Sequence, residues 1–230
     1  MSELHRSLGF ITACFLVLAD GAYGQSLALP RVSSGAETWM RVHVYNDAGL
    51  SQRDLNLAES VATEIFRDKK VEVAWYNCGP SNPTNDAPRC AESLGLNTFE
   101  LRICRSCTSS LSARGREVGG YAAGRTATVS SLWAAQFEQT RYVCSTKVLG
   151  RAMVHELGHL LLGPNHSPVG IMKANWMPED LNPAKLGMLM FTSEQGELIR
   201  SILKLQGSAN SETVASAKSS IQGDLPSANK

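Results

Sequence analysis

The chain has 230 residues, a hydrophobic content of 43% and a formal net charge of +1. This length suits one ordinary domain or two very small ones, and the apolar content is enough for a sizeable core. Because the charge is near zero and both signs are interspersed, nothing favours nucleic acid or an anionic membrane as a partner. We expect a soluble globular monomer.

The first 24 residues have the pattern of an export signal. A short basic segment precedes an apolar run from Leu8 to Ala19, which is too short to span a bilayer comfortably. Ala22-Tyr23-Gly24 then places small residues at the two positions that a signal peptidase reads. We predict a signal peptide over 1–24, cleavage before Gln25 and a secreted or periplasmic protein with a flexible lead-in over 25–38. The alternative is a buried N-terminal helix or an uncleaved anchor.

Signal cleavage leaves five of the six cysteines. Cys78 and Cys90 flank a segment rich in Gly, Pro and Asn, and in an exported protein we expect a disulfide to close that loop. Cys104 and Cys107 could form half a zinc site or a redox pair, but no second Cys/His pair lies at structural-zinc spacing. We favour a disulfide from one of them to Cys144. Since five is odd, one thiol is left over, and the sequence does not identify it.

Two periodic patterns predict a strand, a helix and a second strand at the start of the domain. Residues 40–45 alternate between apolar and polar, which is typical of a half-buried strand. Ser51 and Asp54 form a capping box, and apolar residues then recur at helical spacing as far as Asp68. A strand over 71–76 follows. This order usually gives a parallel pair of strands with a right-handed crossover.

Further strands and a buried helix follow. Residues 98–104 alternate again, 119–122 can form a short edge strand, and 125–133 are rich in the residues that favour strands. A helix capped at 145–146 should run to about Leu162. Apolar residues occupy most of its circumference, so we expect this helix to be buried.

The C-terminal part predicts one more helix and then a tail. Thr192 and Gln195 form a second capping box, and the apolar face of the helix that follows continues to Leu205. Residues 207–230 are rich in Ser, Ala, Gly and Asn and have few large apolar side chains. We expect this tail to be disordered and the folded domain to span 39–206.

The chemistry of the chain centres on one stretch of the buried helix. His155 and His159 lie four residues apart, so their side chains share one face, and Glu156 lies beside the first. In zinc peptidases two such imidazoles bind the metal and the carboxylate acts as general base. Gly163 can end the helix, and His166 follows. Three of the four histidines that remain after signal cleavage lie in these twelve residues, which favours a zinc site.

The stretch 155–172 resembles the signature of the metzincin metallopeptidases, His-Glu-x-x-His-x-x-Gly-x-x-His followed by a Met-turn. It departs in one respect, because three residues instead of two separate His159 from Gly163. His166-Ser167 and Gly170-Ile171-Met172 are similar to the family's His-Ser and Met-turn segments. The resemblance implies an α/β (α+β) fold of zincin type, in which a twisted, mostly parallel sheet packs on a long helix and the active-site helix.

Residue by residue, the resemblance implies that His155, His159 and His166 bind one catalytic zinc ion and leave its fourth position to water. Glu156 would take the proton of that water as it attacks a carbonyl. Met172 would pack beneath the metal without binding it. No further cofactor is implied.

One rival for the third ligand is Glu179, which lies twenty residues after His159, as in thermolysin-like enzymes. We predict a secreted zinc peptidase that hydrolyses peptides or proteins. Two alternatives are a non-catalytic secreted zinc-binding domain that binds a partner and a zinc amidohydrolase of a non-protein substrate. The presence of Glu156 argues against the first, because a purely structural zinc site does not need that carboxylate.

Overall fold

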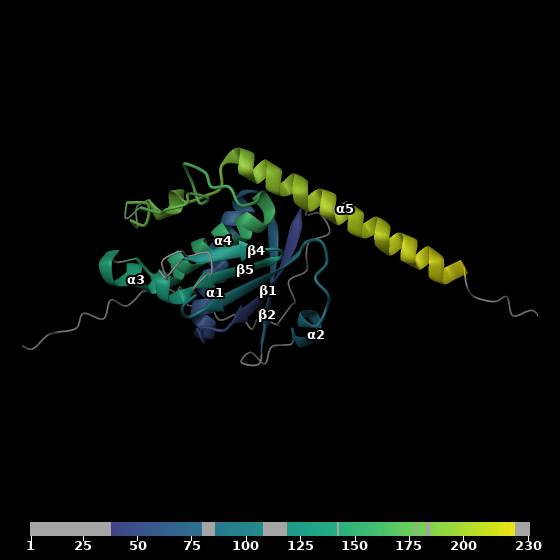
Figure 1. Ribbon diagram of the computed structural model, residues 1–230, viewed down its shortest axis with the longest axis horizontal. Helices are drawn as coiled ribbons and strands as arrows, with labels where there is room; N and C mark the ends of the chain where they lie inside the picture. The colour runs from purple at the N-terminus through teal and green to yellow at the C-terminus, as the bar shows by residue number, and fades with distance from the viewer. Residues whose placement is uncertain are drawn as a thin grey trace, which may run out of the picture. The chain divides into compact units, whose positions relative to one another are not determined.

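The computed structural model describes residues 38–79, 86–107, 119–141, 143–177, 179–182 and 185–223 (Figure 1). The predicted signal peptide and residues 25–37 of the lead-in lie outside the described residues. Among the helices that are described, none has the length and apolar character needed to cross a membrane.

Within the described residues, five strands form one sheet in the order β2-β1-β3-β5-β4. They are β1 (Trp39–Asn46), β2 (Glu72–Cys78), β3 (Thr98–Cys104), β4 (Gly120–Ala123) and β5 (Thr126–Ser130). Strand β1 pairs in parallel with β2 and β3, and β3 pairs in parallel with β5. Only β4 is antiparallel, and it lies at one edge of the sheet. The mostly parallel sheet and the short edge strand are both as predicted.

Helices connect and cover the strands. They are α1 (Gln52–Asp68), α2 (Ala87–Cys90), α3 (Ser131–Arg141), α4 (Ser145–Leu162), the 3-10 helix η1 (Leu186–Met188) and α5 (Ser193–Gly223). Helices α1 and α4 contact one another, α1 also contacts β2, and α4 contacts β3, β4 and β5. These two helices therefore lie on the same face of the sheet, with α3 and α5 against α4.

Both predicted capping residues cap their helices, and the pair before α5 forms the reciprocal box. The backbone N–H of Asp54 donates to Ser51 Oγ at 3.1 Å at the start of α1. Before α5, Gln195 N–H donates to Thr192 Oγ1 at 3.2 Å, and Thr192 N–H donates to Gln195 Oε1 at 2.9 Å. Each bond satisfies a backbone donor that has no partner within its own helix.

Strand alternation puts the core between the sheet and the α1/α4 layer. Met40, Val42 and Val44 of β1 are fully buried there, while the residues between them face the other side of the sheet. Helix α4 is buried around most of its circumference, as its sequence predicted. Its His155 and Glu156 are only 9% and 6% exposed, so the fold holds two ionisable side chains in its interior.

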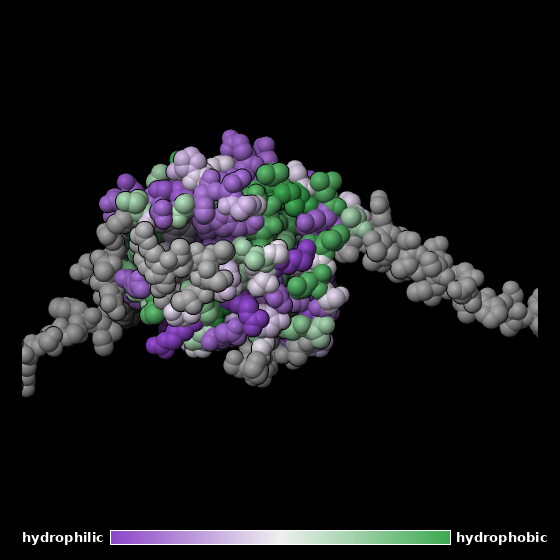
Figure 2. Space-filling view, in the orientation of Figure 1, coloured by the Kyte–Doolittle hydropathy of each residue, from purple (hydrophilic) through white to green (hydrophobic). Residues whose placement is uncertain are grey.

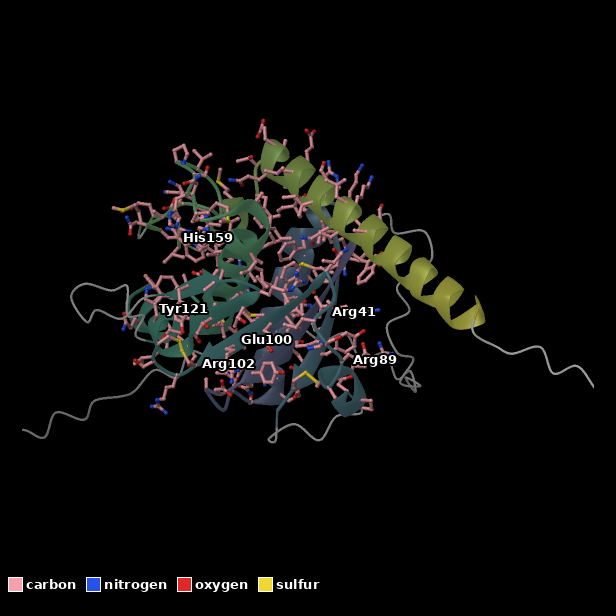
Figure 3. The ribbon with its side chains drawn as sticks, turned by 45° about the vertical axis from the view of Figure 1, so that its right-hand side comes forward. Arg41, Arg89, Glu100, Arg102, Tyr121 and His159 are labelled. Atoms are coloured by element: carbon pink, nitrogen blue, oxygen red, sulfur yellow. A yellow bond between two sulfur atoms is a disulfide. The ribbon has the colours of Figure 1, made fainter. Side chains whose placement is uncertain are left out.

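The opposite face of the sheet is more polar. Arg41, Glu100 and Arg102 project from β1 and β3 on this side (Figure 3). Arg102 pairs with Asp47 at 3.3 Å, and both side chains are about half exposed, so this ion pair adds little stability. In the space-filling view, apolar side chains gather beside α5, where Leu198 and Leu205 are exposed (Figure 2).

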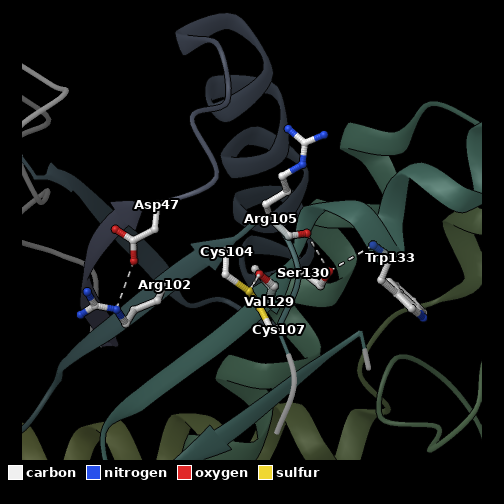
Figure 4. The surroundings of a disulfide bond; sticks show 8 residues. All are labelled: Asp47, Arg102, Cys104, Arg105, Cys107, Val129, Ser130 and Trp133. Carbon is white, nitrogen blue, oxygen red and sulfur yellow. Dashed lines mark hydrogen bonds and ion pairs between the residues drawn. A yellow bond between two sulfur atoms is a disulfide. The ribbon is translucent and has the colours of Figure 1, made fainter. Parts of the chain in front are cut away.

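Two disulfides form in the described chain. The predicted bond between Cys78 and Cys90 ties α2 to the end of β2. The preference for a bond to Cys144 was wrong, because Cys104 and Cys107 bond to each other across a separation of three residues (Figure 4). Cys144 is the N-cap residue of α4, and its Sγ lies 3.0 Å from the Oγ1 atom of Thr146.

Helix α3 was missed, because the strand expected over 125–133 ends at Ser130. Ser130 Oγ donates to Arg105 O at 3.2 Å and accepts the backbone N–H of Trp133 at 3.1 Å (Figure 4). Leu132 N–H also donates to Arg105 O. These bonds satisfy the first donors of a helix, so the chain turns away from the sheet here.

Helix α5 also continues to Gly223, where disorder was expected from residue 207 onward. Its first turns are anchored by Ile199 and Leu203, which are 0% and 1% exposed. Once a helix is nucleated on such an anchor, each further residue adds a hydrogen bond at little cost, and Ala, Ser, Glu and Lys tolerate the helical state. Residues 224–230 lie outside the described chain.

A buried glutamate on α1 should make stability depend on pH. Burial raises the pKa of Glu59 from 4.5 to about 7, against the opposing effect of a hydrogen bond with Asn77. Between these values the folded chain keeps a proton that the unfolded chain releases. The contribution of Glu59 to the free energy of unfolding is therefore fully present below pH 4.5 and is lost as the pH rises to 7. At pH 8 we expect the free energy of unfolding of Glu59→Gln to exceed that of the wild type by roughly 2–3 kcal/mol, so the variant should unfold at a higher urea concentration.

The unfolding free energies of the wild type and Glu59→Gln should converge near pH 4, where the wild-type carboxyl is protonated. Both are measured by urea unfolding in a chelator, so that metal binding does not contribute to the comparison. A stability difference that is the same at both pH values would contradict the buried, protonated state of Glu59.

Candidate metal centre

Three histidines converge at the C-terminal end of α4. His159 Nε2 lies 3.1 Å from His155 Nε2 and 3.2 Å from His166 Nε2. One ligand atom from each of the three lies within 4.8 Å of the others, and no other residues of the described chain form such a group. His155 is buried, His159 is half-buried and His166 is exposed, so one side of the cluster is open to solvent.

Backbone carbonyls hold two of the rings from behind. His155 Nδ1 lies 2.7 Å from the carbonyl oxygen of Ile171, and His159 Nδ1 lies 2.9 Å from that of Gly163. A carbonyl oxygen can only accept, so each Nδ1 must carry the proton and donate it. The Nε2 atoms of both rings are therefore lone-pair donors that face each other.

Two lone pairs at 3.1 Å repel each other unless a proton or a cation lies between them. Nitrogen ligands about 2.0–2.1 Å from one tetrahedral zinc ion lie roughly 3.3 Å apart, close to the two spacings seen here. Burial lowers the pKa of His155 to about 4, so a proton is a poor alternative at neutral pH. The donor set and its spacing fit one zinc ion, with three protein ligands and an open side.

Gly163 connects the end of α4 to the orientation of His159. Its φ of +87° lies in the region that favours glycine, and α4 ends at the residue before it. Gly163 N–H donates to the carbonyl of His159 at 3.0 Å, while its own carbonyl accepts from the ring of the same histidine. The three residues between His159 and Gly163 thus complete the last helical turn and return a carbonyl to the ring.

The segment Gly170-Ile171-Met172 packs against the histidine cluster and against α4. Gly170 has a φ of +71°, and a Cβ atom there would lie 2.4 Å from the carbonyl oxygen of Met190. The turn it makes brings the carbonyl of Ile171 to His155. It also buries Met172, whose sulfur would be 2.6 Å from a Cβ at Gly158 of α4. Met172 therefore packs closely against the backbone of α4.

Glu156 lies on the inner side of α4, against strand β4. Burial raises the pKa of its carboxyl from 4.5 to about 8. A Cβ atom on Gly120 would lie only 2.7 Å from Glu156 Oε1, so the carboxylate rests on the bare backbone of the edge strand. A nearby cation would favour the ionised carboxylate and lower this pKa. A carboxyl whose pKa lies near neutrality suits general acid–base work.

Most of the predicted site residues come together, and the rival ligand does not. Glu179 is exposed and takes no part in the histidine cluster. Tyr121, the next residue of β4, pairs with Thr128 on the opposite sheet face from Gly120, so it points away from Glu156. His43 is 2% exposed and lies edge-to-face with the ring of Tyr76.

Sequence reasoning missed Trp176. Its indole N–H donates at 3.2 Å to the same Ile171 carbonyl that holds His155, and its ring lies 5.7 Å from that imidazole. Trp176 also lies 5.9 Å from the ring of Trp133 on α3. A lone tryptophan in an irregular segment carries no periodic signal, and only the tertiary fold brings it to the site.

The chain is similar to a number of solved structures, among them the following two. The chain is similar to the crystal structure of archaemetzincin from Methanopyrus kandleri, with 18% identity, a TM-score of 0.49, and coverage of 75% of this chain and 99% of that chain. It is also similar to a zinc-dependent peptidase from Methanocorpusculum labreanum, with 16% identity, a TM-score of 0.45, and coverage of 69% and 99%. No protein-family model matches the sequence, and no curated protein matches it.

Proposed function

We propose that this chain is an exported zinc-dependent peptidase in which Glu156 is the general base. The observation that carries the proposal is the pair of imidazole Nε2 atoms facing each other at 3.1 Å, with a buried carboxylate on the residue that follows His155 in the same helix. Three neutral imidazoles beside a single carboxylate form a catalytic type of donor set, because they leave a coordination position open.

The histidines and Glu156 have different roles in the proposed reaction. His155, His159 and His166 would hold the ion, which when bound polarises a carbonyl and makes a water molecule more acidic. Glu156 takes the proton of the attacking water and then delivers it to the nitrogen of the leaving amine. Its buried position keeps bulk water from competing for that proton.

Strand β4 favours an extended peptide over other amides as the substrate. It is an edge strand of the described sheet, and Glu156 rests on its first residue, Gly120. The outer backbone groups of an edge strand are available to pair with an extended chain, which is a common way to bind peptides. A peptide held in this way would pass beside the carboxylate.

The test uses the exported form of the protein, whose N-terminus we expect at Gln25 by mass spectrometry. With one zinc per chain it should cleave members of a mixed peptide library. A chelator should abolish cleavage, and zinc should restore it while magnesium should not, because imidazole ligands suit zinc and carboxylate ligands suit magnesium. Once a substrate peptide is found, methylation of a backbone amide beside its scissile bond should make it a poorer substrate, because the methylated amide can no longer donate a hydrogen bond to β4.

Two results would decide against the proposal. Cleavage that continues at the same rate after the metal is removed would exclude metal-dependent hydrolysis. A chain that binds one zinc but cleaves no peptide would favour the non-catalytic binding domain, or hydrolysis of a non-protein amide if such a substrate is turned over.

A further inference from the structure

The first residue of β4 is a glycine with no room for a side chain. Gly120 pairs with Val129, which is fully buried on the core face, so Gly120 faces α4. A Cβ atom built there would lie 2.5 Å from the carbonyl oxygen of Thr128, 2.6 Å from Glu156 Cγ and 2.7 Å from Glu156 Oε1. All three distances are well below those of ordinary van der Waals contact.

Hydrogen bonds from the described residues do not fix the Glu156 carboxylate. No described residue donates a hydrogen bond to it, although the side chain is only 6% exposed. Packing therefore positions this side chain, and the backbone at Gly120 is part of the surface against which it packs. A contact that leaves the carboxylate oxygens without fixed donors also leaves them able to accept a proton.

Resting on the function proposed above, we infer that Gly120 is a positioning residue, whose lack of a side chain sets where the Glu156 carboxylate lies. A methyl group at this position would meet two obstacles. The Thr128 carbonyl belongs to the backbone of β5 and is held in the sheet. The start of β4 must therefore shift to clear this carbonyl, and the Glu156 side chain, which is the more mobile neighbour, must also move aside.

We expect Gly120→Ala to lower kcat by about 10²-fold, since misplacing a catalytic group by about 1 Å has effects of that size. KM should change much less, and zinc content should stay at one per chain because none of the three atoms nearest to a Cβ at Gly120 belongs to a histidine. A merely structural role would lower the amount of folded protein without changing kcat per folded, zinc-loaded molecule.

Gly150 provides a matched control on α4 itself. A Cβ atom there would lie 2.5 Å from the carbonyl oxygen of Ala58 and 2.8 Å from Val61 Cβ, so it is as crowded as Gly120 but faces α1. Gly150→Ala should lower the melting temperature and leave kcat per folded molecule unchanged. Equal losses of kcat in the two variants would overturn the inference.

A second measurement needs no activity. Gly120→Ala should lower the melting temperature less in a Glu156→Ala background than in the wild type, because the side chain that it collides with is gone. Equal shifts in the two backgrounds would place all the strain at Thr128 and overturn the inference. If Gly120→Ala folds only when combined with Glu156→Ala, the contact is supported; if it folds in neither background, Thr128 alone sets the requirement.

These outcomes separate the inference from the proposed function. Failure of the zinc-loaded wild type to cleave any peptide would remove the peptidase proposal, while the melting-temperature cycle would still report on the contact. Normal wild-type cleavage with an unchanged kcat in Gly120→Ala would remove only the role of Gly120.

Discussion

Replacing Glu156 with glutamine should lower kcat/KM for peptide cleavage by roughly 10²–10⁴-fold, the usual contribution of a general base. Glutamine has the same shape as glutamate, so it still fits against Gly120 and the fold should be unchanged. Because burial raises the pKa of this carboxyl to about 8, the neutral amide should also be at least as well tolerated as the native residue. Zinc content, measured by atomic absorption, should remain one per chain.

Glu197→Gln is the matched control, because it makes the same chemical change at an exposed position of α5. It should leave cleavage and zinc content as in the wild type. Undiminished cleavage by Glu156→Gln would remove Glu156 as the base and, with it, the mechanism proposed here.

Replacing His166 with alanine should weaken zinc binding by more than about 100-fold, since the loss of outer partners of metal ligands alone costs about 10–100-fold. The structure places His166 Nε2 3.2 Å from His159 Nε2, whereas Glu179 lies outside the cluster. Because His166 is exposed, removal of its ring should cost the zinc-free fold little.

The companion variant Glu179→Ala should bind zinc as the wild type does, as judged by competition with a chelating dye. If zinc affinity instead falls in Glu179→Ala and is preserved in His166→Ala, then the ligand set contains two histidines and a glutamate. A loss in both variants would point to a rearranged loop after Gly163.

The parts of the fold that follow from local patterns were predictable. Alternation identified β1 and β3, and the pairing of Ser51 with Asp54 and of Thr192 with Gln195 marked two helix starts. The four-residue spacing of His155 and His159 was sufficient to place both rings on one face of α4. In each case the deciding interaction is made within a few residues of the chain.

What depends on distant parts of the chain was not predictable. The end of β5 is decided at Ser130 by the carbonyl of Arg105, which lies twenty-five residues earlier. The contact of Gly120 with Glu156 and that of Trp176 with His155 likewise join residues from separate elements. The pairing of Cys104 with Cys107 is local, but the sequence offered several chemistries for it and no geometry to choose among them.

The two disulfides close only short loops, of 12 and three residues in sequence separation. In the chain-entropy account the stabilisation depends only weakly on loop length, so bonds of these separations contribute about 3 and about 2 kcal/mol by constraining the unfolded chain. Neither bond joins the layer formed by α1 and α4 to the sheet. Cohesion between these layers comes from the apolar core, and oxidation reinforces two corners at the ends of β2 and β3. Reduction of the two bonds should therefore loosen these two corners first, while the packing between the sheet and the α1/α4 layer stays in place.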